Sequence, residues 1–394
     1  MPHPANASLV ATNTTGYDRL KEVISVPMKD FGNIHREFYA KVYWKHQSMV
    51  VQLINHNNDL YWDELLLEVS ILAHATDTFT ISWERSGAQP AHPVSTQVFL
   101  SRRSNNNTAM PEITGQKRSR GFIQDIAKPF YQMEGPGIEN DKVAFRSFFD
   151  YRNGKDIYGK LVDTPVLSKV GLGASWHQLQ SWGMDILKVG KSLGAGALAV
   201  KDGASLYPLA DADTAYFEEL YEGELQAAFQ LNFINWDAGT KKMDGREQIS
   251  ISKGEFYYSN HIHLPLPTSQ LLVSGLANFG NYPLVFKQHN ARLSSISTYG
   301  KQADGTNTGL GLALLFESAN YVSHHTIDTG TVIANTSYVA LKQPGNQQQV
   351  MYVFACWEKT DARFQTPEGF RRYLQRQADL LANPIIGKVI SQLN

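Results

Sequence analysis

Residues 143–160 read VAFRSFFDYRNGKDIYGK, and apolar side chains alternate with other residues through the first part of this stretch. Successive side chains of an extended strand point to opposite faces, which places Arg146 and Arg152 together, away from the apolar positions. We therefore predict one strand over residues 143–152, with one face in a core and one charged face. The predicted core face comprises Val143, Phe145, Ser147, Phe149 and Tyr151.

Similar short apolar segments recur along the chain, separated by clusters of Gly, Asn, Asp and Pro. This spacing predicts a mainly β fold with many antiparallel strands. No repeat with a period of about 20 to 50 residues is present, which disfavours propellers and solenoids. No long linker divides the chain, so we expect a single domain over residues 1–394. The other predicted strands cover residues 37–43, 49–54, 78–83, 94–100, 225–234 and 350–357.

One segment near the C-terminus has the apolar spacing of a helix. Thr366 stands before Pro367, an arrangement typical of a helix start. We predict a C-terminal helix over residues 367–383. Its apolar face comprises Phe370, Leu374, Ala378 and Leu381.

The composition limits the classes of partner. Hydrophobic residues make up 42% of the chain, enough for a packed core, and 36 basic residues balance 37 acidic ones. A formal charge of −1 provides no general attraction for nucleic acid or an anionic membrane. The longest apolar runs are far shorter than the roughly 20 residues needed to span a bilayer, so we expect a soluble protein.

The cysteine count and the N-terminal residues bear on compartment. One cysteine, Cys356, excludes an intramolecular disulfide framework and a cysteine-rich zinc site. Residues 1–15 lack a basic start followed by an apolar run, so no signal peptide is visible. Either the protein is cytoplasmic or the sequence begins near a mature end. The Asn- and Thr-rich character of these residues favours the second, so we expect a periplasmic or secreted protein, with a cytoplasmic one as the alternative.

Arg146 and Arg152 are candidates for binding an anionic sugar. A guanidinium offers a planar, bidentate fork to a carboxylate, and a neighbouring aromatic ring can cover a sugar face. The alternative interpretation is an ion pair between Arg146 and Asp150, or scattered surface charge.

A second candidate segment, residues 175–196, reads SWHQLQSWGMDILKVGKSLGAG. An imidazole between two tryptophans suits a general base or acid, because histidine ordinarily titrates near neutral pH. The upstream glycine of a phosphate-binding loop is absent, so no nucleotide cofactor is expected. The candidates in this segment are Trp176, His177, Trp182, Asp185 and Lys188.

A third group consists of His261 with His263, and Lys287 with His289. The members of each pair share a face of an extended strand. A His-x-His pair can ligate a metal, but no third ligand is evident, so we expect a polar cleft wall and no metal. Motifs for hydrolase elbows, zinc proteases, dinucleotide folds and CxxC sites are also absent, and no cofactor is expected.

The motifs of residues 131–200 resemble a bacterial domain-of-unknown-function family, number 4861. The resemblance rests on Glu134-Gly135-Pro136, Glu139-Asn140-Asp141, the basic strand, the turn at residues 156–160, His177, and the run at residues 182–196. Proteins of this family are linked with the breakdown of polysaccharides that contain uronic acids, and a dehydratase acting on ulvan oligosaccharides is related. The Glu-Gly-Pro turn is also similar to that of galactose-mutarotase-like and polysaccharide-lyase domains.

The resemblance implies a large antiparallel β-supersandwich that binds an anionic oligosaccharide. Elimination from a uronate needs a cation to neutralise the carboxylate, a base to remove the C5 proton, and an acid for the leaving group. Arg146 or Arg152 with Lys188 suits the first role, His177 the second, and Tyr131 or Tyr158 the third. The leaving group, water or a sugar, stays open.

Two alternatives also stay open. The first is a glycoside hydrolase that uses two carboxylates, for which Glu134, Asp150 and Asp185 are candidates. The second is a sugar-binding module without catalysis. The sequence does not indicate an oligomeric state.

Overall fold

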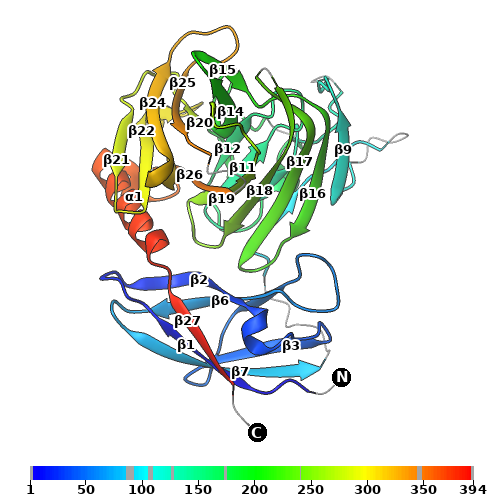
Figure 1. Ribbon diagram of the computed structural model, residues 1–394, viewed down its shortest axis with the longest axis vertical. Helices are drawn as coiled ribbons and strands as arrows, with labels where there is room; N and C mark the ends of the chain where they lie inside the picture. The colour runs from blue at the N-terminus through cyan, green and yellow to red at the C-terminus, as the bar shows by residue number, and fades with distance from the viewer. Residues whose placement is uncertain are drawn as a thin grey trace.

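The computed structural model describes residues 3–85, 93–104, 110–125, 128–172, 175–239, 241–343 and 348–391. Antiparallel sheets make up most of it, and one α-helix occurs within these ranges (Figure 1). The mainly β prediction is confirmed. No helix in this part of the chain is long and apolar enough to cross a membrane.

Two small sheets pack together in the N-terminal part of the chain. Their shared core contains Leu9, Val26, Leu67 and Phe79. The five-stranded sheet has the order β27(Ile386–Ser391), β1(Ala7–Thr12), β7(Thr76–Arg85), β3(Phe38–Trp44), β4(Gln47–Ser48), and the three-stranded sheet has the order β2(Arg19–Pro27), β6(Glu64–Ile71), β5(Val51–Ile54).

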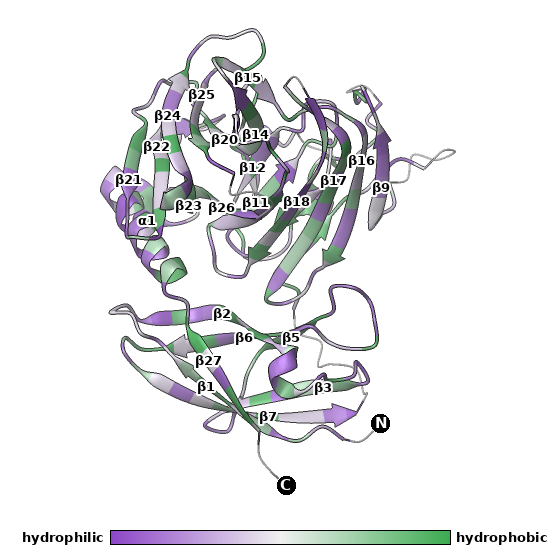
Figure 2. Ribbon diagram, in the orientation of Figure 1, coloured by the Kyte–Doolittle hydropathy of each residue, from purple (hydrophilic) through white to green (hydrophobic). Residues whose placement is uncertain are grey.

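A nine-stranded sheet forms one layer of the larger part of the molecule. Its inner face carries alternate apolar residues, and Figure 2 shows the resulting hydrophobic and hydrophilic bands along β17 and β18. In sheet order its strands are β21(Val285–Gln288), β22(Leu293–Ala303), β23(Thr308–Glu317), β26(Gln349–Trp357), β19(Tyr257–His263), β18(Lys241–Ser252), β17(Gln226–Ala238), β16(Ala212–Tyr221) and β9(Gly115–Ser119).

Two five-stranded sheets face this layer. Tyr258 on β19 contacts both: its ring lies 4.7 Å from that of Phe145, and its hydroxyl donates to the carbonyl oxygen of Ala195 at 2.7 Å. One sheet has the order β13(Gly183–Asp185), β12(Lys155–Lys160), β11(Val143–Ser147), β10(Gly137–Glu139), β8(Gln97–Phe99), and the other β15(Ser205–Pro208), β14(Ala195–Asp202), β20(Gln270–Ala277), β25(Thr336–Leu341), β24(Tyr321–Ile327).

The C-terminal helix is present as predicted. Helix α1(Pro367–Ala382) begins after Thr366, whose side chain accepts a hydrogen bond from the Gly369 N–H at 3.1 Å. Phe370 and Leu374 pack on the outer face of the nine-stranded sheet together with Cys356, which is buried. Beyond the helix, β27 returns to the N-terminal sheets and pairs with β1 (Figure 1). The expectation of one domain over residues 1–394 stays a prediction.

The predicted strand over residues 143–152 is too long. β11 ends at Ser147, and the Phe148 N–H donates to the Gly154 carbonyl, which closes a turn. The carboxylate of Asp150 accepts from the Arg152 N–H at 2.8 Å, a turn-forming contact of aspartate. Tyr151, predicted to face the core, is exposed for this reason.

Candidate functional site

An ion network lies on the face of β11 that points away from the nine-stranded sheet. Phe145 points toward that sheet, so its neighbour Arg146 points away from it. Strand register places Arg146 of β11 opposite Asp156 of β12. It also places Tyr158 of β12 opposite Asp185 of β13. The alternation therefore brings four functional groups to one patch.

The guanidinium of Arg146 is buried and is surrounded by carboxylates. It hydrogen bonds closely to Asp156, lies 3.2 Å from Glu134 Oε2 and lies 3.5 Å from Asp185 Oδ2. The Tyr158 ring centroid is 5.3 Å from the same guanidinium carbon. A charge this deeply buried is stable only with such partners.

Asp156 and Asp185 interact directly and form an acid pair. Burial raises the pKa of Asp156, and Arg146 opposes the shift. Burial and then the charge of Asp156 raise the pKa of Asp185 well above the ordinary carboxyl value. The pair therefore titrates as a unit and retains a proton above the usual carboxyl range.

Glu134 connects the two predicted arginines. Its carboxylate receives Arg146 at 3.2 Å and Arg152 at 3.1 Å, and Arg152 also binds Asp150. The backbone of Glu134 has φ 66°, an uncommon conformation for a residue with a side chain. Such local strain is often retained at functional sites.

His177 is the exposed end of the network. Its Nδ1 lies 3.7 Å from Asp185 Oδ2, and 63% of the side chain is accessible. Asp185 Oδ2 in turn contacts Arg146, so the ion contacts run without a break from His177 through Arg146 and Glu134 to Arg152. The structure thus brings the basic segment and the tryptophan-flanked histidine together.

The two tryptophans flank this network in different ways. The carbonyl of Trp176 accepts from the Asp185 N–H at 2.8 Å, which positions the aspartate. The ring of Trp182 packs against Tyr158 with 6.2 Å between centroids, inside a small apolar cluster. The Tyr158 hydroxyl is buried and finds no hydrogen-bond partner among the described residues, and burial raises its pKa well above the ordinary value.

Tyr131 lies in a different environment from Tyr158. Its ring contacts Phe122, Phe130 and Phe149 within the main core. Burial raises the pKa of Tyr131. None of the described ion contacts connects it with the Arg146 network.

The histidines of the third segment are not brought to the network. The two neighbours of His261 on β19, Asn260 and Ile262, are buried, and Asn260 donates to Glu247. His261 and His263 therefore lie on the outer face of the nine-stranded sheet. His289 bonds Gln375 of α1 and Ser295, which is a structural connection. No group of three possible metal ligands occurs in the described ranges.

Lys287 and Lys188 complete the predicted residues. Lys287 lies on β21, the edge strand of the nine-stranded sheet.

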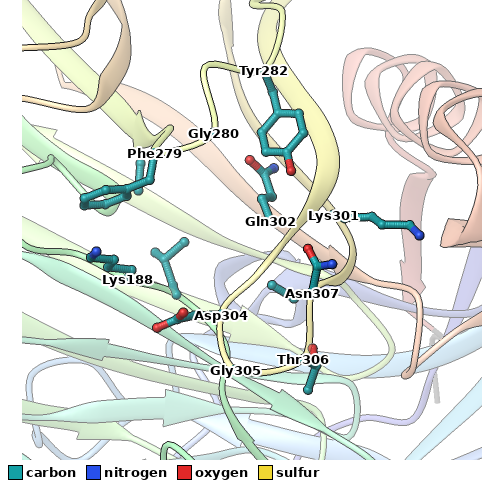
Figure 3. Close-up of a pocket in the computed structure, with 13 residues that line it drawn as sticks. Lys188, Phe279, Gly280, Tyr282, Lys301, Gln302, Asp304, Gly305, Thr306 and Asn307 are labelled. Carbon is teal, nitrogen blue, oxygen red and sulfur yellow. The ribbon is translucent and has the colours of Figure 1, made fainter.

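Lys188, in contrast, lines a cavity of about 490 Å³, shown in Figure 3. Reasoning from the sequence missed the other lining residues because they come from three separate segments. They include Phe279, Tyr282, Gln302 and Asp304.

Several residues of the sequence motifs support the fold instead of the network. Lys160 donates to Glu139 at 2.6 Å, and Glu139 also accepts from the N–H groups of Val166 and Leu167. Gly159 lies against the Trp357 ring, where an added Cβ would be 2.4 Å from a ring carbon. These contacts explain the Glu-Asn-Asp and Gly-Lys motifs as packing devices.

Two solved structures are similar to the chain at low identity. An alpha-mannosidase from Enterococcus faecalis aligns with 99% of this chain and 46% of its own, at 9% identity and a TM-score of 0.45. A protein in glycosyl hydrolase family 38 from the same organism aligns with 99% and 48%, at 10% identity and a TM-score of 0.45. The chain thus spans about half the length of these proteins.

The comparison with curated proteins gives no match. The model of one protein family, described as "Domain of unknown function (DUF4861)", matches residues 11–386, nearly the whole chain. The specific resemblance to an ulvan dehydratase stays a prediction. The chain belongs to the DUF4861 family.

Proposed function

We propose that the protein is a carbohydrate-active enzyme that eliminates water or a sugar leaving group from uronate-containing oligosaccharides, its anionic partner. The main support is the continuous set of contacts from exposed His177 through Asp185 and Arg146 to Arg152. Abstraction of a proton beside a carboxylate requires a base and a cation near each other.

The proposed steps assign a role to each end of the network. Arg152, 38% exposed, and Lys188 neutralise the substrate carboxylate, which makes the C5 proton more acidic. His177 removes that proton through Nε2, with the Asp185 carboxyl group 3.7 Å from Nδ1 on the other edge of the ring. The C5–H electrons form the C4–C5 double bond as the C4–O bond breaks.

The departing oxygen also needs a proton. Tyr158 is the tyrosine that contacts Arg146, whereas Tyr131 lies in the aromatic core, so Tyr158 is the better candidate. Its hydroxyl is buried and has no hydrogen-bond partner among the described residues, so its proton is not engaged elsewhere there. Tyr158→Phe removes that proton source and keeps the ring in place.

The test is incubation of the full chain with a panel of uronate oligosaccharides. Elimination creates a double bond conjugated with the carboxylate, which absorbs ultraviolet light. Product mass then separates loss of water from loss of a sugar. No absorbance change across a wide panel would contradict the proposal.

A glycoside hydrolase is the second candidate, favoured by the buried Asp156 and Asp185 pair. A carboxyl group with a raised pKa can act as a general acid. The other two carboxylates suggested by the sequence, Glu134 and Asp150, are held by arginines. New reducing ends without a double bond, lost in Asp185→Asn, would support this alternative.

A further inference from the structure

The cavity beside Lys188 is formed by three segments that are distant in the sequence. They are the connection after β13, the loop after β20 and the hairpin between β22 and β23 (Figure 3). Its volume of about 490 Å³ lies within the usual range for small-molecule sites. One or two sugar units are a suitable occupant for a space of this size.

One aromatic side chain of the cavity, Tyr282, is held in a fixed position. Tyr282 lies against Gly280 and Gly300, where added Cβ atoms would come within 2.3 Å and 2.1 Å of its ring. The buried amide of Asn278 receives the Tyr282 N–H and donates to the Tyr282 carbonyl, both at 2.8 Å. Larger residues at the two glycines would displace the ring.

Phe279 provides an accessible apolar face. It is 36% exposed and packs over Gly190. The Lys188 amine lies 4.8 Å from its ring centroid, which is a cation–π distance. An exposed ring beside a cation offers a sugar both an apolar surface and a charge partner.

Polar groups complete the lining. Gln302 donates through Nε2 to the Thr298 hydroxyl and the Leu310 carbonyl, and in Figure 3 its amide oxygen lies on the Phe279 side. Asp304 adds a hydrogen-bond acceptor for hydroxyl groups. Lys188 has no carboxylate within ion-pair distance among the described residues, so the cavity offers a cation to a ligand.

From these contacts we infer that this cavity is the subsite for an anionic pyranose unit. Lys188 binds its carboxylate, Phe279 and Tyr282 cover its apolar surface, and Gln302 and Asp304 bind its hydroxyl groups. The inference rests on the proposed function for the identity of the ligand and adds the place where it binds.

The position of the cavity relative to His177 supports this assignment. Gly305 lies at the tip of the cavity-lining hairpin with φ 70°, and a Cβ added to it would be 3.2 Å from the His177 carbonyl oxygen. The hairpin therefore contacts the segment that carries His177 on one side and lines the cavity on the other. The cavity and the segment that carries the proposed base are therefore connected through one short hairpin.

The test measures binding by calorimetry to the full chain carrying His177→Ala, which removes turnover. The probes are an oligosaccharide ending in glucuronic acid and the same molecule with its carboxyl group reduced to an alcohol. Lys188→Met should weaken binding of the acid about tenfold or more and barely change binding of the alcohol. Phe279→Ala should weaken binding of both by about three- to tenfold.

Matched controls are available at remote exposed positions. Lys29→Met, in the 3-10 helix Met28–Phe31 of the N-terminal part, and Tyr216→Ala, on β16, should leave both affinities unchanged. Lys188→Arg should restore much of the binding of the acid because the charge is retained. Equal affinities in the Lys188 and Phe279 variants and the controls would overturn the inference, as would failure of both probes to bind.

The outcomes separate this inference from the proposed function. If binding depends on Lys188 and Phe279 but the unaltered protein forms no double bond, the subsite is supported and the proposed elimination is overturned. If the protein forms the double bond and the KM is the same in Lys188→Met and Lys29→Met, the proposed elimination is supported and the subsite is overturned.

Discussion

At the scale of single residues, His177 is the proposed base and has little structural role. Its side chain is 63% exposed and makes one ion contact, at 3.7 Å from Asp185. We expect His177→Ala to lower kcat for double-bond formation by about 10² to 10⁴, the usual contribution of a general base. The free energy of unfolding should change by less than about 0.5 kcal/mol.

The control for this histidine is His325→Ala, an exposed histidine on β24. Ultraviolet absorbance gives the rate, and urea denaturation gives the stability. Equal rates in the two variants would show that His177 is not the base.

Arg146 has the opposite balance, because its side chain is buried among three carboxylates. We expect Arg146→Met to lower the free energy of unfolding by about 3 to 5 kcal/mol, since it leaves Asp156 and Asp185 without a cation. Adding Asp156→Asn should restore part of the loss. Urea denaturation measures both, with exposed Arg371→Met as a control that changes stability by less than about 0.5 kcal/mol.

Part of this network could be predicted from the sequence. Arg146, Arg152, His177 and Asp185 stand in motifs rich in charge and aromatics, and the structure connects them. The sequence does not predict a role for Asp156, because that role depends on the register of β11 with β12, which places it opposite Arg146. Cross-strand register is set by the whole sheet and not by local residue type.

At the scale of elements, the turn between β18 and β19 meets helix α1 through a titrating contact. The Tyr373 hydroxyl of α1 lies 3.4 Å from Glu255 Oε2. Burial, and then the charge of Glu22, raises the pKa of Glu255 to about 8. An unfolded glutamate has an ordinary, lower pKa, so unfolding releases a proton between the two values.

The free energy of unfolding should therefore fall as pH rises. The contribution of this contact is fully present below the ordinary carboxyl pKa and disappears as pH approaches about 8. From about pH 5 to about pH 8 we expect the unaltered protein to lose roughly 1 kcal/mol or more relative to Glu255→Gln in urea denaturation. Glu368→Gln, an exposed change on the same helix, should leave the pH dependence unaltered, and parallel curves for all three proteins would contradict the assignment.

Elements were predicted best where one local pattern is sufficient. The helix at residues 367–382 has its cap, its proline and its apolar spacing in one short segment, and it was predicted within one residue. The predicted strand over residues 143–152 is longer than the observed strand over residues 143–147, because Phe149 and Tyr151 continue the apolar alternation through a turn. Asp150 and the Asn153-Gly154 pair were the available turn signals.

At the scale of the whole molecule, the sequence did not reveal how distant segments meet. The cavity uses residues near positions 188, 280 and 304, and the nine-stranded sheet joins β9 to strands far along the chain. Such pairings depend on the packing of entire sheets, which single-segment periodicity does not encode. The same holds for β27, which returns from α1 to complete the N-terminal sheet.

The return of β27 predicts a difference between two adjacent residues. Val389 pairs with buried Leu9 and packs against the N-terminal core, whereas its neighbour Ile390 is 48% exposed. Val389→Asp would place a carboxylate against that core without a partner, and we expect a loss of about 2 to 4 kcal/mol in urea denaturation. Ile390→Asp should change stability by less than about 1 kcal/mol because its side chain faces water.

Limited proteolysis locates the effect of these two changes. Because β27 covers one edge of β1, weakening it should expose the N-terminal sheets to cleavage before the nine-stranded sheet is attacked. The ion network and the cavity lie in the larger part of the molecule, away from β27. Val389→Asp should therefore lower the free energy of unfolding but leave the catalytic rate, measured at low temperature, nearly unchanged. Equal destabilisation by Val389→Asp and Ile390→Asp would mean that β27 does not alternate between core and solvent, and that the C-terminal strand is not a structural part of the N-terminal sheet.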